Sequence, residues 1–120
     1  MKDKRVHRIS EEVKRELSDI IQNKLKDPRI PPLTSVSFVS VTRDLSYAKV
    51  GISIFGDAEA KKDAMDGLES AKGFIKKELG NRLKLRVMPE LLLELDESIE
   101  KGMALEETIN KVMESEHHSE

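Results

Sequence analysis

The feature that most constrains the fold is the order in which the spacing of apolar residues changes along the chain. From about Lys4 to Lys26 they recur every three or four residues, which predicts one long amphipathic helix. They alternate with polar residues in Val36–Val41 and Tyr47–Ile54, which predicts two strands. Helical spacing returns from Ala64 to Leu79, and strand-like alternation returns at about Glu90–Asp96. The predicted order is therefore helix, strand, strand, helix, strand.

Polar breaks separate these elements. Asp27-Pro28-Arg29 ends the first helix, because the residue before a proline disfavours helical backbone, and Pro31-Pro32 extends the break. Arg43–Ser46 supplies a short polar turn, so the two strands are predicted to form a hairpin. Asp57 is a candidate N-cap for the second helix.

Two positions within the predicted helices need an explanation. Ser10 could cap a shorter first helix, but Val6 and Ile9 keep the helical spacing, so we place Ser10 inside it. Gly73 interrupts the second helix in the middle and costs roughly 1 kcal/mol relative to alanine. A bend or a close approach of another backbone would explain this glycine.

Charge divides the chain into a basic body and an acidic C-terminal segment. Residues Glu90–Glu120 include ten acidic and two basic residues, whereas the preceding residues include 19 basic and 13 acidic ones. The stretch Ser70–Met88 alone has six basic residues and one acidic residue. A basic surface attracts phosphate backbones, because each Lys or Arg that replaces a condensed counterion adds salt-dependent affinity. Most charge runs are simply solvated helix faces, so composition leaves both interpretations open.

Composition excludes several functional classes. The chain has no cysteine, which rules out disulfides, thiol catalysis and cysteine-ligated zinc. The longest aliphatic run, Leu91–Leu93, is too short to span a membrane, so we expect a cytoplasmic protein. Aromatic residues are too few for a base-stacking platform, so any RNA contact is expected to be mainly to backbone and shape. These aromatic residues are Phe38, Tyr47, Phe55 and Phe74.

The sequence contains no motif that is typical of an enzyme active site. The glycines form no phosphate-binding motif. Two of the three histidines, His117 and His118, stand in the acidic C-terminal segment, where we expect no functional site. Glu94 and Asp96 could form a carboxylate pair about 6 to 7 Å apart on a strand, but a solvated strand face is the commoner arrangement. We therefore expect no enzyme, no catalytic residue, no metal site and no cofactor.

The order of elements resembles a type II KH domain, an RNA-binding fold in which a GxxG loop clamps the nucleic-acid backbone. No two glycines here are three apart, and Ala71-Lys72-Gly73 stands at the corresponding place. This sequence resembles the ribosome-binding factor A family, in which a helix-kink-helix with an AxG sequence replaces the loop. Four further segments agree in collinear order over roughly residues 5–103: LKDPRI at 25–30, VTRDLSYAKV at 41–50, GFIKKELGNRLKLRVMPEL at 73–91 and DES at 96–98.

The resemblance implies an α+β, type II KH-like domain of the order helix-strand-strand-helix-kink-helix-strand, with a three-stranded sheet and helices on one face. It implies a non-catalytic assembly factor that binds the small (30S) ribosomal subunit and promotes late maturation and 5′-end processing of 16S rRNA. Such factors are bacterial and are linked to growth in the cold. The expected partner is 16S rRNA within the subunit, with no membrane and no small-molecule substrate, and the expected state is a monomer.

We expect residues 1–100 to form the KH-like RNA-binding domain. Residues 101–120 are expected to form an acidic tail that is partly helical or disordered, since only Leu105, Ile109 and Val112 keep a weak helical spacing there.

The candidate RNA-binding residues form two groups. On a helical wheel Gly73 and Lys77 lie opposite the apolar stripe, so bare backbone is expected to face solvent beside an ammonium group. The first group is Ala71, Lys72, Gly73, Lys76, Lys77, Arg82, Lys84 and Arg86. The other basic candidates are Arg5, Arg8, Lys26, Arg29 and Arg43. For any single lysine, surface solubility explains its presence equally well. The alternative function is a protein-interaction adaptor that uses the first helix and the acidic tail without direct RNA binding.

Overall fold

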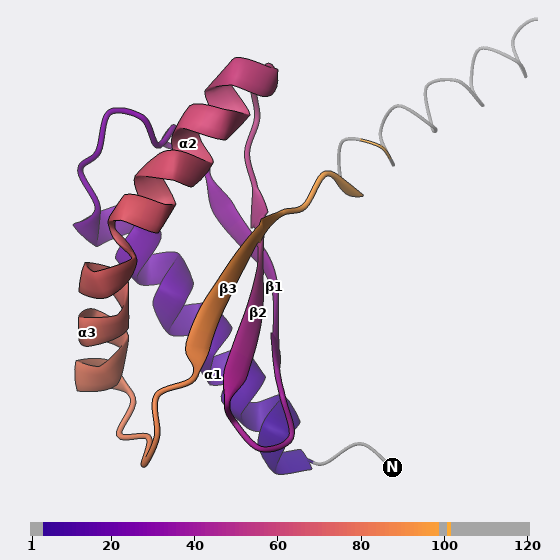
Figure 1. Cartoon of the computed structure of the whole chain (residues 1–120), viewed down its shortest axis with the longest axis vertical. Coiled ribbons are helices and arrows are strands. Elements are labelled where there is room, and N and C mark those ends of the chain that lie inside the picture. Colours follow the sequence, from indigo (N-terminus) through magenta and orange to yellow (C-terminus); the bar gives the residue numbers. More distant parts are fainter. Residues whose placement is uncertain (1–3, 99–100, 102–120) are drawn as a thin grey trace, which may run out of the picture.

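The computed structural model describes residues 4–98 and residue 101 (Figure 1). Within this part of the chain the elements are α1 (Lys4–Asp19), the π-helical turn η1 (Ile20–Lys24), β1 (Ser35–Val41), β2 (Tyr47–Ser53), α2 (Ala58–Ser70), α3 (Lys72–Arg82) and β3 (Glu90–Leu95). The predicted order of helices and strands is confirmed, and so is the α+β class.

The strands form one mixed sheet in the order β1-β2-β3. The β1–β2 hairpin is antiparallel, as predicted, whereas β3 pairs with β2 in parallel. Along β2, Ala48, Val50 and Ile52 are fully buried while Tyr47 and Lys49 are exposed. This alternation shows that one face of the sheet is covered, and the helices lie on that face (Figure 1).

The first helix packs through the apolar stripe that its sequence predicts, with Val13 and Leu17 at the centre of the core. Ser10 lies inside the helix, as expected. Although it is a polar residue it is buried, and its Oγ accepts a hydrogen bond from the Val41 backbone N–H at 3.1 Å. This bond ties α1 to the end of β1.

The end of the first helix differs from the prediction of a uniform helix to Lys26. The Leu25 N–H donates to the Ile20 carbonyl oxygen at 3.1 Å, five residues back, so the last turn is π-helical. Within this wider turn both Ile20 and Ile21 are buried. The apolar spacing predicted the extent of the helix well, but it could not reveal the change in winding.

The predicted helix cap and hairpin turn are confirmed. Asp57 caps α2, and its Oδ1 accepts a hydrogen bond from the Ala60 N–H at 2.8 Å. The hairpin turn is held by Asp44, whose Oδ1 accepts hydrogen bonds from the Thr42 hydroxyl at 2.9 Å and the Ser46 N–H at 3.0 Å. The expected weak helix after Leu105 and the acidic tail lie outside the described residues.

Candidate nucleic-acid interface

The break between α2 and α3 falls at Ala71, two residues before the position that the sequence suggested. Ala71 has φ −88° and ψ 1°, which separates the two helices (Figure 1). Gly73 lies in the first turn of α3, and, apart from its chain neighbours and the backbone of its own helix, a Cβ atom added there would meet no atom within 4 Å. The glycine is therefore required neither for packing nor for the bend itself.

The absence of a side chain at Gly73 nevertheless exposes the backbone at the beginning of α3. The helix begins without a side-chain cap, so its first backbone N–H groups can donate to an anion. The carbonyl end of α2, one residue earlier, opposes any contribution from the dipole of α3. Lys77 is exposed one turn further along and forms no ion pair with a described residue. The arrangement suits a phosphate group that approaches α3 closely.

Two other basic residues of α3 are already paired. The Lys76 Nζ lies 2.9 Å from Glu90 Oε2, and the Lys72 Nζ lies 3.7 Å from both Glu90 and Glu69. The hydrogen bond from Lys76 lowers the pKa of the Glu90 carboxyl. RNA would have to displace Glu90 before it could use these two lysines fully.

Arg82 is even more strongly engaged. It pairs with Asp19 and Glu16 of α1, and its Nε lies 3.9 Å from Glu78. The hydrogen bond from Arg82 lowers the pKa of Asp19, and the same bond raises the pKa of Arg82. These contacts hold α3 against α1, so they favour a structural role for Arg82, and its predicted role in RNA binding stays a prediction.

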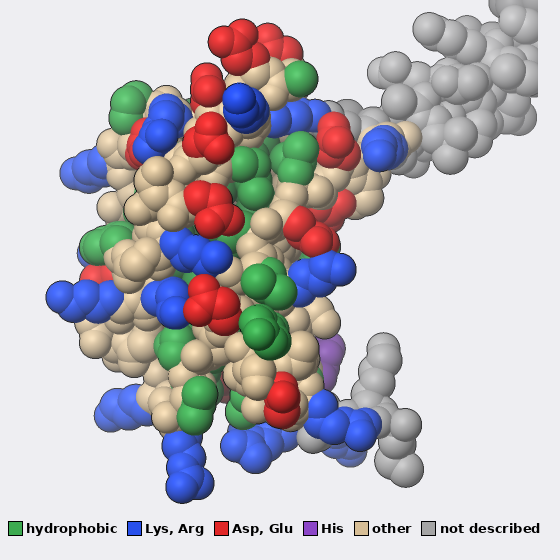
Figure 2. All heavy atoms as spheres, in the orientation of Figure 1, with side chains coloured by type: hydrophobic (Ala, Val, Ile, Leu, Met, Phe, Trp, Pro, Cys, Tyr) green, Lys and Arg blue, Asp and Glu red, His purple; other side chains and the backbone are tan. Residues whose placement is uncertain are grey.

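A cleft gathers the remaining basic side chains. It lies between the N-terminal half of α1 and the segment that follows α3, and the tip of the hairpin contributes Leu45. Figure 2 shows Lys and Arg side chains along the lower end of the molecule, where α1 begins and the segment after α3 turns. The basic residues in the cleft wall are Arg5, Arg8, Arg15, Arg82, Lys84 and Arg86, and the acidic ones are Glu12 and Glu16.

The structure thus brings part of each predicted group together, Arg5 and Arg8 with Arg82, Lys84 and Arg86. Arg8, Lys84 and Arg86 are exposed and form no ion pair within the described ranges. Arg5 lies in the same cleft wall. Lys77 is a further exposed cation on α3, outside the cleft wall. We refer to Arg5, Arg8, Lys77, Lys84 and Arg86 together as the α1–α3 strip.

Arg15 is a cleft residue that the sequence interpretation missed. It is exposed and lies on the same side of α1 as Arg5, Arg8 and Glu12. Their spacing of three, four and three residues places them on one helical face, so a search for charged stripes, beside the apolar one, would have found it.

The other two predicted arginines lie apart from this cleft wall. Arg43 is exposed in the hairpin turn. Arg29 forms an ion pair with Asp27 at 2.7 Å, and its backbone N–H donates to the same carboxylate at 2.9 Å. Hydrogen bonds from Arg29 lower the pKa of Asp27. Arg29 therefore stabilises its own loop.

The carboxylate pair considered for catalysis does not converge. Glu94 faces Lys49 at 3.7 Å, whereas Asp96 accepts a hydrogen bond from the Ser37 hydroxyl at 2.6 Å. Among the described residues no group of three His, Cys, Asp or Glu side chains is arranged to hold a metal ion. No helix in the same part of the chain is long and apolar enough to cross a membrane.

A family model, sequence relatives and solved structures that are similar to this chain all carry the same description. The family model described as ribosome-binding factor A matches residues 5–109. A ribosome-binding factor A from Clostridium botulinum (strain Hall) is 51% identical over 112 residues, covering 93% of each chain. The crystal structure of ribosome-binding factor A from Thermus thermophilus superposes with a TM-score of 0.66 at 28% identity, covering 75% of this chain and 93% of that one.

A further structural match comes from a ribosomal complex. A homology model of the Thermus thermophilus factor, fitted into the cryo-electron microscopy map of its complex with the 30S subunit, has a TM-score of 0.62. It is 28% identical to this chain and covers 73% of this chain and 91% of its own length.

Proposed function

Because the chain belongs to the ribosome-binding factor A family, we propose that it binds the small (30S) ribosomal subunit as an assembly factor. It promotes late maturation and 5′-end processing of 16S rRNA, acts by binding rather than by catalysis, and works in the cytoplasm. The observation that carries this proposal is the likeness to the Thermus thermophilus factor placed in a 30S complex.

The α1–α3 strip supplies the physical basis for RNA binding. Its Lys77, Lys84 and Arg86 are exposed and not neutralised by a neighbouring acid in the described structure. Each of them can displace a condensed counterion from rRNA, which contributes affinity that falls as the salt concentration rises. Gly73 lets a phosphate approach the backbone of α3 in the same region.

The contacts expected from this strip are mainly to phosphates and riboses. Contacts of this kind position a protein on RNA and recognise its shape, but they carry little sequence information. The protein would therefore recognise how 16S rRNA helices are arranged in space. That arrangement changes as the subunit matures. Dependence on this factor should be greatest in the cold, where misfolded rRNA rearranges slowly.

Binding to purified 30S subunits and to deproteinised 16S rRNA at several salt concentrations tests the proposal. We expect salt-sensitive binding to the subunit and weaker, salt-sensitive binding to the free rRNA. A protein-interaction adaptor would bind neither in a salt-sensitive manner. Cells depleted of the protein at low temperature should accumulate 16S rRNA with an unprocessed 5′ end, and normal processing in those cells would contradict the assembly role.

A further inference from the structure

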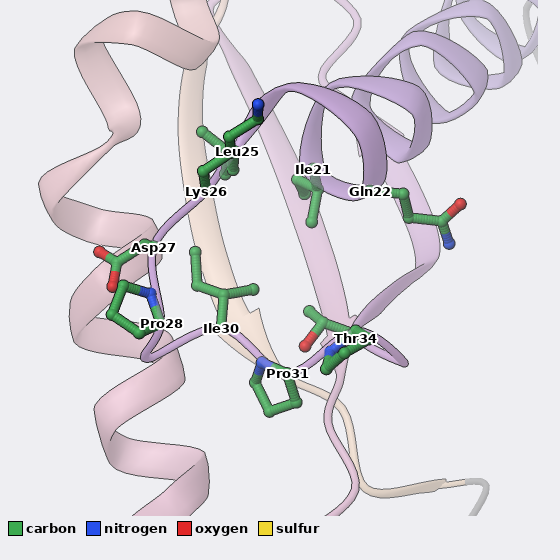
Figure 3. A pocket seen from close by; sticks show the side chains of 10 residues that line it. Ile21, Gln22, Leu25, Lys26, Asp27, Pro28, Ile30, Pro31 and Thr34 are labelled. Atoms are coloured by element: carbon green, nitrogen blue, oxygen red, sulfur yellow. The ribbon is translucent and has the colours of Figure 1, made fainter.

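A pocket outside the α1–α3 strip lies between η1 and the proline-rich loop that follows it (Figure 3). Its walls include Ile21 and Leu25 from the end of the first helix, and Ile30 and Pro31 from the loop. Thr34 forms part of the wall where the loop leads into β1. The pocket is therefore largely apolar, and it is open to solvent on one side.

Thr34 is the unusual residue of this pocket. Only 1% of its surface is exposed, and its Oγ1 has no hydrogen-bond partner among the described residues. In Figure 3 its side chain points toward Ile30 and Pro31. A buried hydroxyl without a partner destabilises a protein, and valine would fill the same space without that cost. An unsatisfied hydroxyl in a pocket wall suggests that a ligand supplies the missing partner.

The rim of the pocket carries one exposed cation, Lys26. No described residue forms an ion pair with it. The one acidic residue in the wall, Asp27, is already bound by Arg29 through both side chain and backbone. An anionic group can thus approach Lys26 without competing against a nearby free carboxylate.

The loop that forms the pocket is held in place. A Cβ atom added at Gly67 of α2 would lie 3.2 Å from both Asp27 Oδ2 and Ile30 Cγ1, so the loop packs closely on α2. The Thr34 N–H donates to the Pro31 carbonyl oxygen at 3.1 Å. The prolines restrict the backbone of the loop. The π-helical turn η1 beside it is a geometry that is common at functional sites. A ligand would therefore meet walls that are already ordered, which lowers the entropic cost of binding. Only a small outward movement of the loop would be needed to uncover the Thr34 hydroxyl, which is buried in the free protein.

We propose that this pocket binds an unpaired nucleobase of the RNA to which the protein attaches, an inference that rests on the proposed function. The apolar walls take the faces of the base, the Thr34 hydroxyl donates a hydrogen bond to the base or its ribose, and Lys26 binds the adjoining phosphate. Unstacked single-stranded bases are commonly held by stacking and by hydrogen bonds to their edges, and here aliphatic and proline side chains would take the place of the usual aromatic ones. The pocket would add a base contact to a surface that otherwise recognises phosphates.

Two observations favour a nucleotide over an apolar protein side chain. A leucine or phenylalanine would leave the Thr34 hydroxyl without a partner and would make no use of Lys26. In addition, η1, whose Ile21 lines the pocket, packs against α3, the helix that carries Gly73 and Lys77. We expect an RNA strand bound along α3 to extend toward Lys26.

The test uses the full chain and a single-stranded RNA of about eight nucleotides, with a duplex of equal length for comparison. Amide chemical shifts of Ile21, Leu25, Ile30 and Thr34 should change with the single strand and not with the duplex. Thr34→Val should raise the thermal midpoint while lowering affinity for the single strand roughly 3- to 10-fold, the effect of one hydrogen bond. Lys26→Ala should also weaken binding, whereas Lys62→Ala, which removes an exposed lysine from α2, should not.

Three results would overturn the base pocket. The first is a Thr34→Val variant that gains stability without any change in RNA affinity, and the second is a set of shifts confined to the α1–α3 strip. The third is weaker binding of the variants to whole subunits with unchanged affinity for deproteinised rRNA, which would identify a ribosomal protein as the occupant. Salt-sensitive subunit binding that persists in any of these cases would leave the proposed function intact.

Discussion

At the kink between α2 and α3, Gly73 is a residue whose presence the fold does not explain. Gly73 has a helical environment with open space where a side chain would stand, so the fold does not need it. Helix propensity favours alanine over glycine by up to about 1 kcal/mol, and by less in the first turn than in the interior of a helix. A residue that sacrifices stability without a packing reason is best explained by what approaches it, and we propose that rRNA phosphate does.

We therefore predict that Gly73→Ala stabilises the protein and weakens its binding to the 30S subunit. A gain of up to about 1 kcal/mol should raise the thermal midpoint by at most roughly 4 to 8 °C in a domain of this size. Gly73→Glu adds bulk and negative charge to the same face, so it should fold and should bind more weakly than Gly73→Ala. Thermal unfolding and subunit binding measure the two effects. Normal binding by Gly73→Glu would place the RNA surface elsewhere.

The ion pairs of Arg82 predict how stability depends on pH. The pKa of Asp19 is lower in the folded protein than its ordinary value of 3.8, chiefly because of the hydrogen bond from Arg82. A carboxyl whose pKa is depressed by folding stabilises the protein above its unfolded pKa and loses that contribution as pH falls. The thermal midpoint should therefore fall as the pH is lowered from about 5 to below the ordinary pKa of a carboxyl group.

Arg82→Gln should reduce the part of this acid sensitivity that arises from Asp19, because its partner is gone. The remaining sensitivity comes from carboxyls with other partners, such as Glu90 with Lys76 and Asp96 with Ser37. Thermal scans of both proteins across this pH range provide the measurement. An identical pH profile would show that the Arg82 pairs contribute nothing to stability.

At the scale of elements, the spacing of residues predicted those features that depend on neighbouring residues in the sequence. It did not predict those that depend on packing between distant segments. The hairpin, the Asp57 cap and β3 follow from local signals, and all are confirmed. The π-helical winding of η1, in which the Leu25 N–H donates to the Ile20 carbonyl oxygen, has no local sequence signal. The position of the break at Ala71 likewise reflects how α2 and α3 pack, which no local propensity encodes.

The same limit applies to the candidate site. The sequence identified most of the basic residues, but it could not tell that Lys72 and Lys76 share Glu90, which lies 14 positions or more away along the chain. Nor could it show that α1 and the segment after α3 form one cleft. Ion pairs between elements depend on the tertiary fold. Only the structure therefore shows which basic side chains are paired with a carboxylate and which are free to bind phosphate.

Lysines that are free and lysines that are paired with Glu90 should differ in how much they contribute to the salt dependence of binding. If each contact neutralises one phosphate, the logarithm of the binding constant falls with the logarithm of salt by roughly 0.7 to 0.9 per contact. Replacing Lys77 and Lys84 with alanine should weaken subunit binding and flatten that slope by roughly one to two units. Replacing Lys72 and Lys76 should change the slope less, because Glu90 already neutralises them.

Stability should change little in the Lys77 and Lys84 variant, since exposed charges contribute only about 0 to 1 kcal/mol each. A salt slope that changes equally in both double variants would show that the ion pairs with Glu90 open on binding. An unchanged slope in a folded Lys77 and Lys84 variant would transfer the role to Arg5, Arg8, Lys26, Arg29 and Arg43.

At the scale of the whole molecule, the distribution of charge is the property that links fold to function. The chain has a formal net charge of −2, yet the body that carries the α1–α3 strip is basic and the C-terminal segment is acidic. A near-neutral total therefore conceals a surface that attracts RNA at short range and a segment that repels it.

The last prediction concerns removal of that acidic segment. Truncation after Gly102 removes five acidic residues and one basic residue, so the remaining protein is more positive and should bind 30S subunits with equal or slightly higher affinity. We expect the KH-like domain to end near residue 100, so the thermal midpoint should stay within a few degrees. Unfolding scans and subunit binding of the truncated and full chains test both expectations. A large loss of stability would mean that Leu105, Ile109 and Val112 pack on the folded domain, and the domain would then extend beyond residue 100.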